Sequence, residues 1–213
     1  MCIYRPACTP SSTSAWCSAP SSCDGMRRSA AGGRAIAELD RLAGLGVRVI
    51  KLHPNTQKFD VAGPSVARIV ARTAELGLVV LFDAFSPWDA DESGKFLMLA
   101  IQHPKARMIL AHLGGPRFHE CAMFGLVRRY SWYPRNLWFD LSAVAAFYVD
   151  SPYREQLVWV IRAIGTDRIL FGSDWPADPP ERAVAAVRSL GLNPAEQAQI
   201  LHSNAMSLLG ACR

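Results

Sequence analysis

Strand-like and helix-like segments alternate along most of this chain, and this alternation limits its possible folds more than any other feature. Short apolar runs predict strands, and a segment with helical spacing of its apolar residues lies between each strand and the next. The predicted strands are residues 47–52, 78–82, 107–111, 136–141 and 168–173. Strands separated by helices are parallel and joined by right-handed crossovers, as in a doubly wound sheet or a (β/α)₈ barrel.

The spacing of the strands favours the barrel over the doubly wound sheet. Helices are predicted at about 34–43, 64–76, 91–102, 116–130, 152–164, 180–190 and 194–209. One strand with its helix takes about 30 residues, which is the repeat of a (β/α)₈ barrel. A complete barrel needs eight such units and typically ~250 residues. The sequence therefore predicts an α/β fold that is a partial (β/α)₈ barrel, with the first three strands missing.

The first 33 residues differ in composition from the rest of the chain. They are rich in Ser, Pro, Ala and Cys and show neither helical nor strand periodicity. We expect residues 1–33 to be a disordered or non-native-looking tail and residues 34–213 to form one incomplete barrel domain. Because the tail is unlike any part of a barrel, we expect a truncated or frame-shifted start of the coding sequence.

Composition and charge exclude several classes of function. The cysteines lack the paired Cys-x-x-Cys spacing of a structural zinc site, and no signal peptide is recognisable, so we expect a reducing, cytoplasmic compartment. The net charge of +5 comes from scattered arginines, which argues against nucleic-acid binding. No apolar run approaches the roughly 18 residues of a membrane span. The expected partner is therefore a small-molecule substrate.

Polar, reactive side chains follow the predicted strands at their carboxyl ends. These ends share one rim, where (β/α)₈ enzymes place their active sites. Each residue also has a structural explanation; Asp174, for example, could cap the helix predicted at 180–190. The rim residues are Lys51, His53, Asp83, His112, Asp140 and Asp174. Carboxylates and imidazoles on one rim suit a divalent metal and metal-assisted hydrolysis.

The residues around these strand ends resemble the amidohydrolase-related family, the metal-dependent hydrolases and decarboxylases of (β/α)₈ fold also called family-2 amidohydrolases. The resemblance rests on Lys-Leu-His-Pro at 51–54, Leu-Ala-His-Leu-Gly-Gly at 110–115, Trp-Phe-Asp-Leu-Ser at 138–142 and Asp-Arg-Ile-Leu-Phe-Gly-Ser-Asp-Trp-Pro at 167–176. It covers about residues 34–210. It implies that the visible strands are the fourth to the eighth of the barrel.

The resemblance also implies roles for the rim residues. Asp174 would bind the metal or its water and act as general base, and His112 would lie at the metal site or contact the substrate. Asp83 stands where a further metal-binding histidine is usual, and aspartate can ligate zinc or manganese. The implied cofactor is a divalent metal ion, zinc or manganese, held by Asp83, His112 and Asp174.

Three further residues are candidates for binding the substrate. By the resemblance, Lys51 and His53 would line the substrate pocket. Trp175, beside the last strand end, is a candidate apolar wall for a ring-bearing substrate, or a packing residue. Besides Asp83, the chain departs from the family pattern at the first strand, because the His-x-His pair that ends it in the family is absent.

Three hypotheses about function follow from these residues. The first is a metal-dependent hydrolase of a small-molecule amide, lactone or ester that uses metal-activated water. The second is a decarboxylase on the same scaffold, and the third is a non-catalytic fragment, which the missing His-x-His pair favours. A nucleotide-binding domain would need a Gly-x-Gly-x-x-Gly or Walker-type loop, which this sequence lacks. An incomplete barrel also predicts exposed strand edges, through which the chain could form a homo-oligomer.

Overall fold

The computed structural model describes residues 2–4 and 32–210 of the chain, and its centre is a sheet whose strands follow chain order. Five of these strands are parallel, and β1 pairs antiparallel with β2 at one edge. The strands are β1 (Cys2–Tyr4), β2 (Val49–Leu52), β3 (Val79–Asp83), β4 (Arg107–Ala111), β5 (Leu137–Asp140) and β6 (Ile169–Leu170). The five strands predicted from the sequence are confirmed, as is their parallel arrangement.

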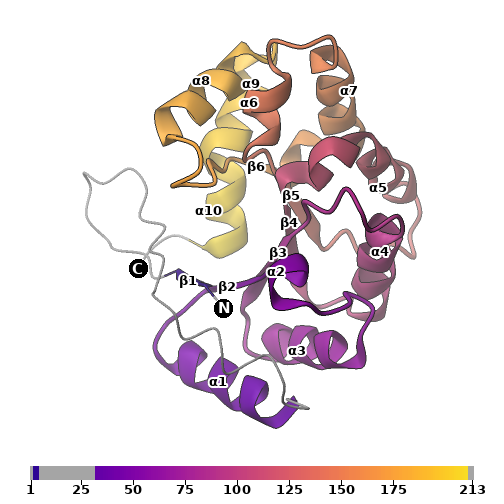
Figure 1. Cartoon of the computed structure of the whole chain (residues 1–213), viewed down its shortest axis with the longest axis vertical. Coiled ribbons are helices and arrows are strands. Elements are labelled where there is room, and N and C mark those ends of the chain that lie inside the picture. The colour runs from indigo at the N-terminus through magenta and orange to yellow at the C-terminus, as the bar shows by residue number, and fades with distance from the viewer. Residues whose placement is uncertain (1, 5–31, 211–213) are drawn as a thin grey trace.

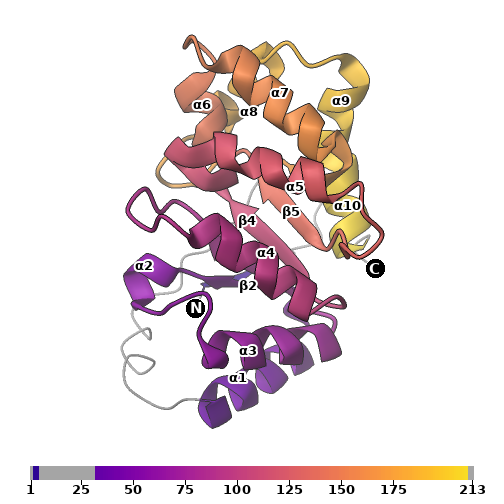
Figure 2. The ribbon, with the colours of Figure 1, turned by 90° about the vertical axis from the view of Figure 1, so that its right-hand side faces the viewer.

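Helices connect the parallel strands and cover one face of the sheet, and α3, α4, α5 and α7 lie over that face in Figure 2. The longer helices confirm the predicted ranges closely. They are α1 (Gly32–Gly44), α3 (Pro64–Glu75), α4 (Glu92–Gln102), α7 (Arg154–Ile164) and α8 (Pro180–Ser189). The shorter ones are α2 (Pro54–Gln57), η2 (His112–Cys121), α5 (Ala122–Val127), α6 (Val144–Tyr148), η3 (Thr166–Arg168), α9 (Pro194–Ala198), η4 (Gln199–Ser203) and α10 (Asn204–Leu209).

The predicted helix at 116–130 is wrong in its first half. Residues 112–121 form an irregular 3₁₀ segment, and α5 is the only α-helical part of the predicted range. Inside the predicted range Arg117 departs from helical φ/ψ, and just before it Leu113, Gly114 and Gly115 all have positive φ, which an α-helix does not allow. The chain therefore turns sharply after β4 before it enters α5. The last predicted helix, 194–209, is helical throughout, but its middle part, η4, is a π-helical turn between α9 and α10.

Alternate strand residues build two hydrophobic layers, because successive side chains point to opposite faces of a sheet. One face packs under the connecting helices, with Val80, Phe82, Met108, Leu110 and Phe139 buried in the main core. The other face packs against Leu208 of α10, which lies on the opposite side of the strands in Figure 1. Its strand residues are Val49, Val79, Leu81, Ile109, Ala111 and Leu170. The C-terminal helix thus covers the face that would point into a closed barrel.

Both edges of the described sheet are partly covered. At one edge β1 pairs with β2, in register from Cys2 opposite Lys51 to Tyr4 opposite Val49. At the other edge the Asn204 side chain donates to the backbone carbonyl of Ile169 at 2.7 Å. The expected exposed edges are therefore less open than predicted, and homo-oligomer formation through them stays a prediction.

The predicted tail at residues 1–33 falls mostly outside the described residues. Within it, β1 is a strand that the sequence analysis did not predict, because three residues are too few to show periodicity. Residues 32 and 33 are already helical and belong to α1. The division into a tail and one barrel domain otherwise stays a prediction. In the described part of the chain, no helix has the length and apolar character that a membrane crossing requires.

Candidate active site

The carboxylate of Asp83, at the end of β3, is the centre of a cluster of rim side chains. Its Oδ2 atom lies 3.2 Å from His112 Nε2, 3.4 Å from Lys51 Nζ and 3.5 Å from His53 Nε2. Lys51 and His53 come from the end of β2, and His112 directly follows β4. Parallel pairing of β2, β3 and β4 brings these residues to the same rim, as the sequence predicted.

The cluster is an ion pair with further positive charge beside it. Burial alone would raise the pKa of Asp83, but the hydrogen bond from His112 and the nearby cations outweigh it and lower that pKa far below its usual range. Burial alone would lower the pKa of His112, but the hydrogen bond to Asp83 and the charges of Asp140, Asp83 and Asp174 raise it to about 9. At neutral pH the pair is therefore an imidazolium and a carboxylate.

The second ring nitrogen of His112 is fixed by the segment that follows β5. Its Nδ1 atom lies 3.0 Å from Ser142 Oγ and 3.2 Å from the Ser142 carbonyl oxygen. The Ser142 hydroxyl donates to Asp140 Oδ1, so both groups facing Nδ1 act as acceptors. Nδ1 therefore carries a proton. With Asp83 facing Nε2, both nitrogens of His112 donate, which agrees with the raised pKa.

Asp140 holds the backbone around this ring as well. Its Oδ1 atom accepts from the backbone N–H of His112 at 2.9 Å and from that of Ser142 at 3.0 Å. Asp140 was predicted as one of several rim carboxylates. In the structure all these bonds stay within the protein, so Asp140 positions His112 rather than facing a ligand.

The turn after β4 leaves room for an aromatic wall beside His112. Phe85 packs edge-on against the His112 ring, with ring centroids 5.9 Å apart. A Cβ atom at Gly115 would lie 2.5 Å from the Phe85 ring, so only glycine fits there. The double glycine of the resemblance thus has a local function, which is to let the loop after β3 close against the histidine.

Asp174 follows β6 with φ of +64°, and its side chain is half-buried. The alternative that Asp174 caps the next helix is wrong, because α8 begins only at Pro180 and its N-cap is Pro179. Within the described chain, the Asp174 carboxylate has neither a hydrogen bond nor an ion pair. Its charge nevertheless raises the pKa of His112, so it faces the cluster without touching it.

The two remaining predicted substrate residues are accessible. Burial lowers the pKa of His53, and the charges of Lys51 and His112 lower it further. The charges of Asp83 and Asp174 oppose this change but do not cancel it, so the His53 imidazole is neutral at pH 7. Trp175 is 50% exposed and forms no contact with the Asp83 cluster. Its predicted role as a wall of the substrate pocket stays a prediction.

A divalent metal does not fit the described residues in this arrangement. No three His, Cys, Asp or Glu side chains of residues 2–4 and 32–210 are placed so that they could hold a metal ion. The predicted ligands Asp83 and His112 bind each other instead, and the Lys51 ammonium shares the carboxylate. Ligation of a metal would require His112 to give up its hydrogen bond to Asp83, since a metal needs a neutral histidine. Ligation by Asp83, His112 and Asp174 therefore stays a prediction without structural support.

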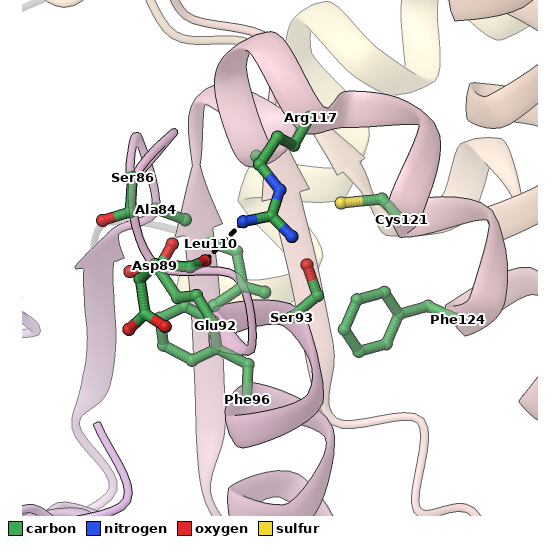
Figure 3. Close-up of a pocket in the computed structure, with 11 residues that line it drawn as sticks. Ala84, Ser86, Asp89, Glu92, Ser93, Phe96, Leu110, Arg117, Cys121 and Phe124 are labelled. Carbon is green, nitrogen blue, oxygen red and sulfur yellow. Dashed lines mark hydrogen bonds between the residues drawn. The ribbon is translucent and has the colours of Figure 1, made fainter. Parts of the chain in front are cut away.

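A small pocket lies beside the cluster between α4 and η2. Figure 3 shows Glu92, Asp89 and Ser86 on one side of it and Arg117 on the other. Glu92 is 7% exposed, and burial, together with the charges of Asp89 and Asp83, raises its pKa to about 7 against the hydrogen bond from Ser86. Ser86 also accepts from Asn55, which ties this cavity to the loop over the rim.

The sequence analysis missed the supporting residues of the site. Ser142 stands inside one of the quoted motifs, yet its bond to His112 depends on two strands that are 30 residues apart. The Asp-x-Ser spacing at 140–142 was the available clue, since an aspartate often accepts from the backbone two residues later. No sequence pattern pointed to Glu92, because its carboxylate is buried only by the loop that folds over α4.

A comparison with protein families places this chain in a known group of proteins. The model of a family described as Amidohydrolase matches residues 18–211, which is most of the chain. The chain belongs to the amidohydrolase family. A search among curated proteins finds no match. Members of this family generally use a divalent metal. The described residues of this chain, in contrast, form no site that fits such a metal.

Comparison with solved structures shows the fold of this amidohydrolase. 5-Carboxyvanillate decarboxylase from Sphingomonas paucimobilis is 17% identical, with a TM-score of 0.61, over 84% of this chain and 63% of that one. A TIM-barrel protein from Bordetella bronchiseptica is 20% identical, with a TM-score of 0.68, over 84% and 62%. A protein provisionally assigned as 2-pyrone-4,6-dicarboxylic acid hydrolase from Pseudomonas putida is 21% identical, with a TM-score of 0.57, over 82% and 67%.

These comparisons confirm the predicted partial (β/α)₈ barrel. The match includes most of this chain, but this chain spans less than two thirds of the length of the first two structures. The matched proteins include a decarboxylase and a hydrolase, so the likeness fixes the architecture and leaves the reaction open.

Proposed function

We propose that this amidohydrolase hydrolyses a small-molecule ester, lactone or amide at the rim formed by the ends of β2 to β6, with Asp174 as the general base. One observation carries the proposal. Among the described rim carboxylates, Asp83 and Asp140 accept hydrogen bonds or ion pairs from neighbouring groups, whereas Asp174 has no such partner. A general base must be accessible and free to accept a proton, and the partly exposed Asp174 carboxylate, which has no partner in the described chain, meets these two conditions.

The cationic cluster supports the second requirement of hydrolysis, which is stabilisation of the negative charge that develops on the carbonyl oxygen. His112 and Lys51 bring two positive charges to the single carboxylate of Asp83. The buried His112 is fixed, while the Lys51 side chain is 24% exposed and can be reached by a bound molecule. A fixed positive charge in a partly dry site stabilises an oxyanion better than it would in water.

The proposed sequence of steps keeps its protons balanced without a metal. Asp174 takes a proton from water as the water oxygen attacks the carbonyl carbon, and the carbonyl oxygen becomes negative. The tetrahedral species then breaks its bond to the leaving group, which receives the proton back from Asp174. The metal-dependent version of this hydrolysis, with zinc or manganese, has no support from the described residues, and no step is assigned to a metal.

Decarboxylation is a second candidate, supported by the same cluster. One compared structure is a carboxyvanillate decarboxylase, and Lys51 together with His112 would attract a substrate carboxylate. Loss of carbon dioxide leaves a carbanion that must gain one proton. Asp174 would have to deliver that proton, so this reaction requires Asp174 to start protonated, whereas hydrolysis requires it ionised.

An assay that separates these reactions tests the proposal. The purified chain is supplied with aryl esters, lactones and anilides, followed by release of acid, and with hydroxylated aromatic acids, followed by release of carbon dioxide. We expect acid release from at least one ester or lactone, reduced about 100-fold or more by Asp174→Asn. Asp150→Asn is the matched control, because Asp150 is exposed and lies outside the rim.

Two results would contradict the proposed hydrolysis. Carbon dioxide release without any acid release would favour the decarboxylase. A folded wild-type chain that turns over neither substrate class, with circular dichroism showing intact helices, would favour the non-catalytic fragment.

A further inference from the structure

A small cavity lies at the amino-terminal ends of β5 and β6, opposite the rim that carries Asp83 and His112. Its empty space, counted together with the solvent at its open mouth, is about 230 Å³. Its floor is apolar and includes Leu137 and Ile164. Its polar lining consists of Arg128, Tyr133, Arg135 and Arg168.

The arginines give this cavity an excess of positive charge. Arg128 and Arg168 both pair with Asp167, at 3.2 Å and 3.5 Å, so two guanidinium groups share one carboxylate. Arg135 donates from Nε to the Arg128 carbonyl and pairs with no carboxylate among residues 2–4 and 32–210. Three positive charges therefore face one negative charge, and that carboxylate is itself half-exposed.

Two donors at the cavity lack acceptors. Arg168 Nε is buried and has no hydrogen-bond partner within the described chain, although the Asp167 carboxylate lies near it. Tyr133 is 6% exposed, and its hydroxyl forms no hydrogen bond to any described residue. The phenol lies close enough to Arg168 and Arg128 for their charges to act on its pKa, which burial raises. Arg168 Nε is the buried donor of the two and would normally be satisfied by a partner, a water or a ligand, whereas the Tyr133 hydroxyl can reach solvent.

Stacking and hydrogen bonds within the chain hold two of these arginines in place. Arg168 stacks over the Trp138 ring, with its guanidinium carbon 4.6 Å from the ring centroid. Arg128 donates to the carbonyl of Ile164 at the end of α7, passing over Gly165, where a side chain would collide with it. Rigid guanidinium groups lose little conformational freedom when they bind, and their planar donor pairs match oxyanions.

We propose that this cavity binds a small tetrahedral oxyanion, of the phosphate class, between the guanidinium groups of Arg128, Arg135 and Arg168 and the Tyr133 hydroxyl. The site is separate from the rim and does not depend on the reaction proposed there. An oxyanion supplies acceptors for the two unpartnered donors and neutralises the charge excess. The apolar floor and the small volume exclude a large organic group.

Titration of the full chain with inorganic phosphate at low ionic strength tests the site, with calorimetry and thermal unfolding as readouts. We expect binding in the millimolar range or tighter and a raised unfolding temperature, neither of which sodium chloride at equal ionic strength reproduces. Tyr133→Phe should weaken phosphate binding about tenfold while leaving the unliganded fold as stable as before, since the lost hydroxyl has no partner. Arg135→Gln should weaken it by a similar factor.

Two controls separate the site from general charge effects. Arg154→Gln removes an exposed arginine of α7 outside the cavity and should leave phosphate binding unchanged. Asp174→Asn should also bind phosphate normally, which distinguishes this site from the rim. The proposal is overturned if phosphate acts no differently from chloride, if Tyr133→Phe binds as tightly as the wild type, or if Arg154→Gln weakens binding as much as Arg135→Gln.

Discussion

Replacement of Asp83 by asparagine should destabilise the fold strongly in mild acid and much less in alkali. Asp83 is 5% exposed and His112 is 4% exposed, so little solvent screens their interaction. Asparagine keeps the size of the side chain but removes the negative charge that faces His112 and Lys51. Removing one partner of a buried ion pair typically costs about 3–5 kcal/mol.

The raised pKa of His112 sets the size and the pH range of this effect. The difference between its ordinary pKa of 6.5 and about 9 corresponds to roughly 3 kcal/mol, at about 1.4 kcal/mol for each pH unit. Because the folded-state pKa is the higher one, the stabilisation is complete below pH 6.5 and disappears as the pH rises through about 9. The lowered pKa of Asp83 means that this contribution is lost only in strong acid.

Urea unfolding at about pH 6 and at about pH 10 measures the effect. Asp83→Asn should lose up to about 3 kcal/mol of unfolding free energy at the lower pH, because Asp140 and Asp174 keep part of the effect on His112, and under about 1 kcal/mol at the higher one. Asp150→Asn, at an exposed position, is the control and should change little at either pH. An equal loss at both pH values would refute the ion pair as the source of stability.

Three further predictions concern other parts of the molecule. Glu92→Gln should stabilise the fold by on the order of 2 kcal/mol at about pH 8 and have little effect below pH 4.5, as unfolding curves at both pH values will test. The reason is that a carboxyl whose pKa is raised to about 7 destabilises the fold once it ionises. Asn204→Ala should cost about 1–3 kcal/mol in urea unfolding, because two carbonyls beside β6 lose their donor; no loss would contradict the edge role. After loading with zinc or manganese and dialysis, the folded chain should retain less than about one-tenth equivalent of metal by elemental analysis, whereas a full equivalent would restore the predicted metal site.

The sequence predicted the sheet well because each strand carries its own evidence. Residues 78–82 and 107–111 are continuous apolar runs bounded by glycine or charge, as buried parallel strands usually are. Parallel order then places the residues after each strand on one rim without further information. This is why Lys51, Asp83 and His112 could be placed together from sequence alone.

The parts that the sequence did not predict depend on contacts between distant segments. Whether Asp83 binds a metal or pairs with His112 depends on distances of a few tenths of an ångström, which no spacing pattern contains. The helix expected at 116–130 is α-helical only at 122–127, and positive φ at Gly114 and Gly115, just before that range, makes a turn that admits Phe85. Capping of a helix by Asp174 was plausible by residue type, yet α8 begins six residues later.

The arginine cavity is an example of the same limit. Arg128, Arg135 and Arg168 are separated in sequence and appeared as part of a scattered positive charge. Only the packing of α5, α7 and η3 brings them to one cavity beside Tyr133. Net charge alone therefore gave no indication of a local anion site.

The central claim is that Asp174 is the base of a hydrolytic rim. The most direct test measures kcat and KM of the wild type and of Asp174→Asn on the best ester or lactone substrate. We predict a loss of about 100-fold or more in kcat, with the unfolding free energy nearly unchanged, because this carboxylate has no partner in the described chain. A folded Asp174→Asn protein that keeps more than about a third of wild-type kcat would contradict the account.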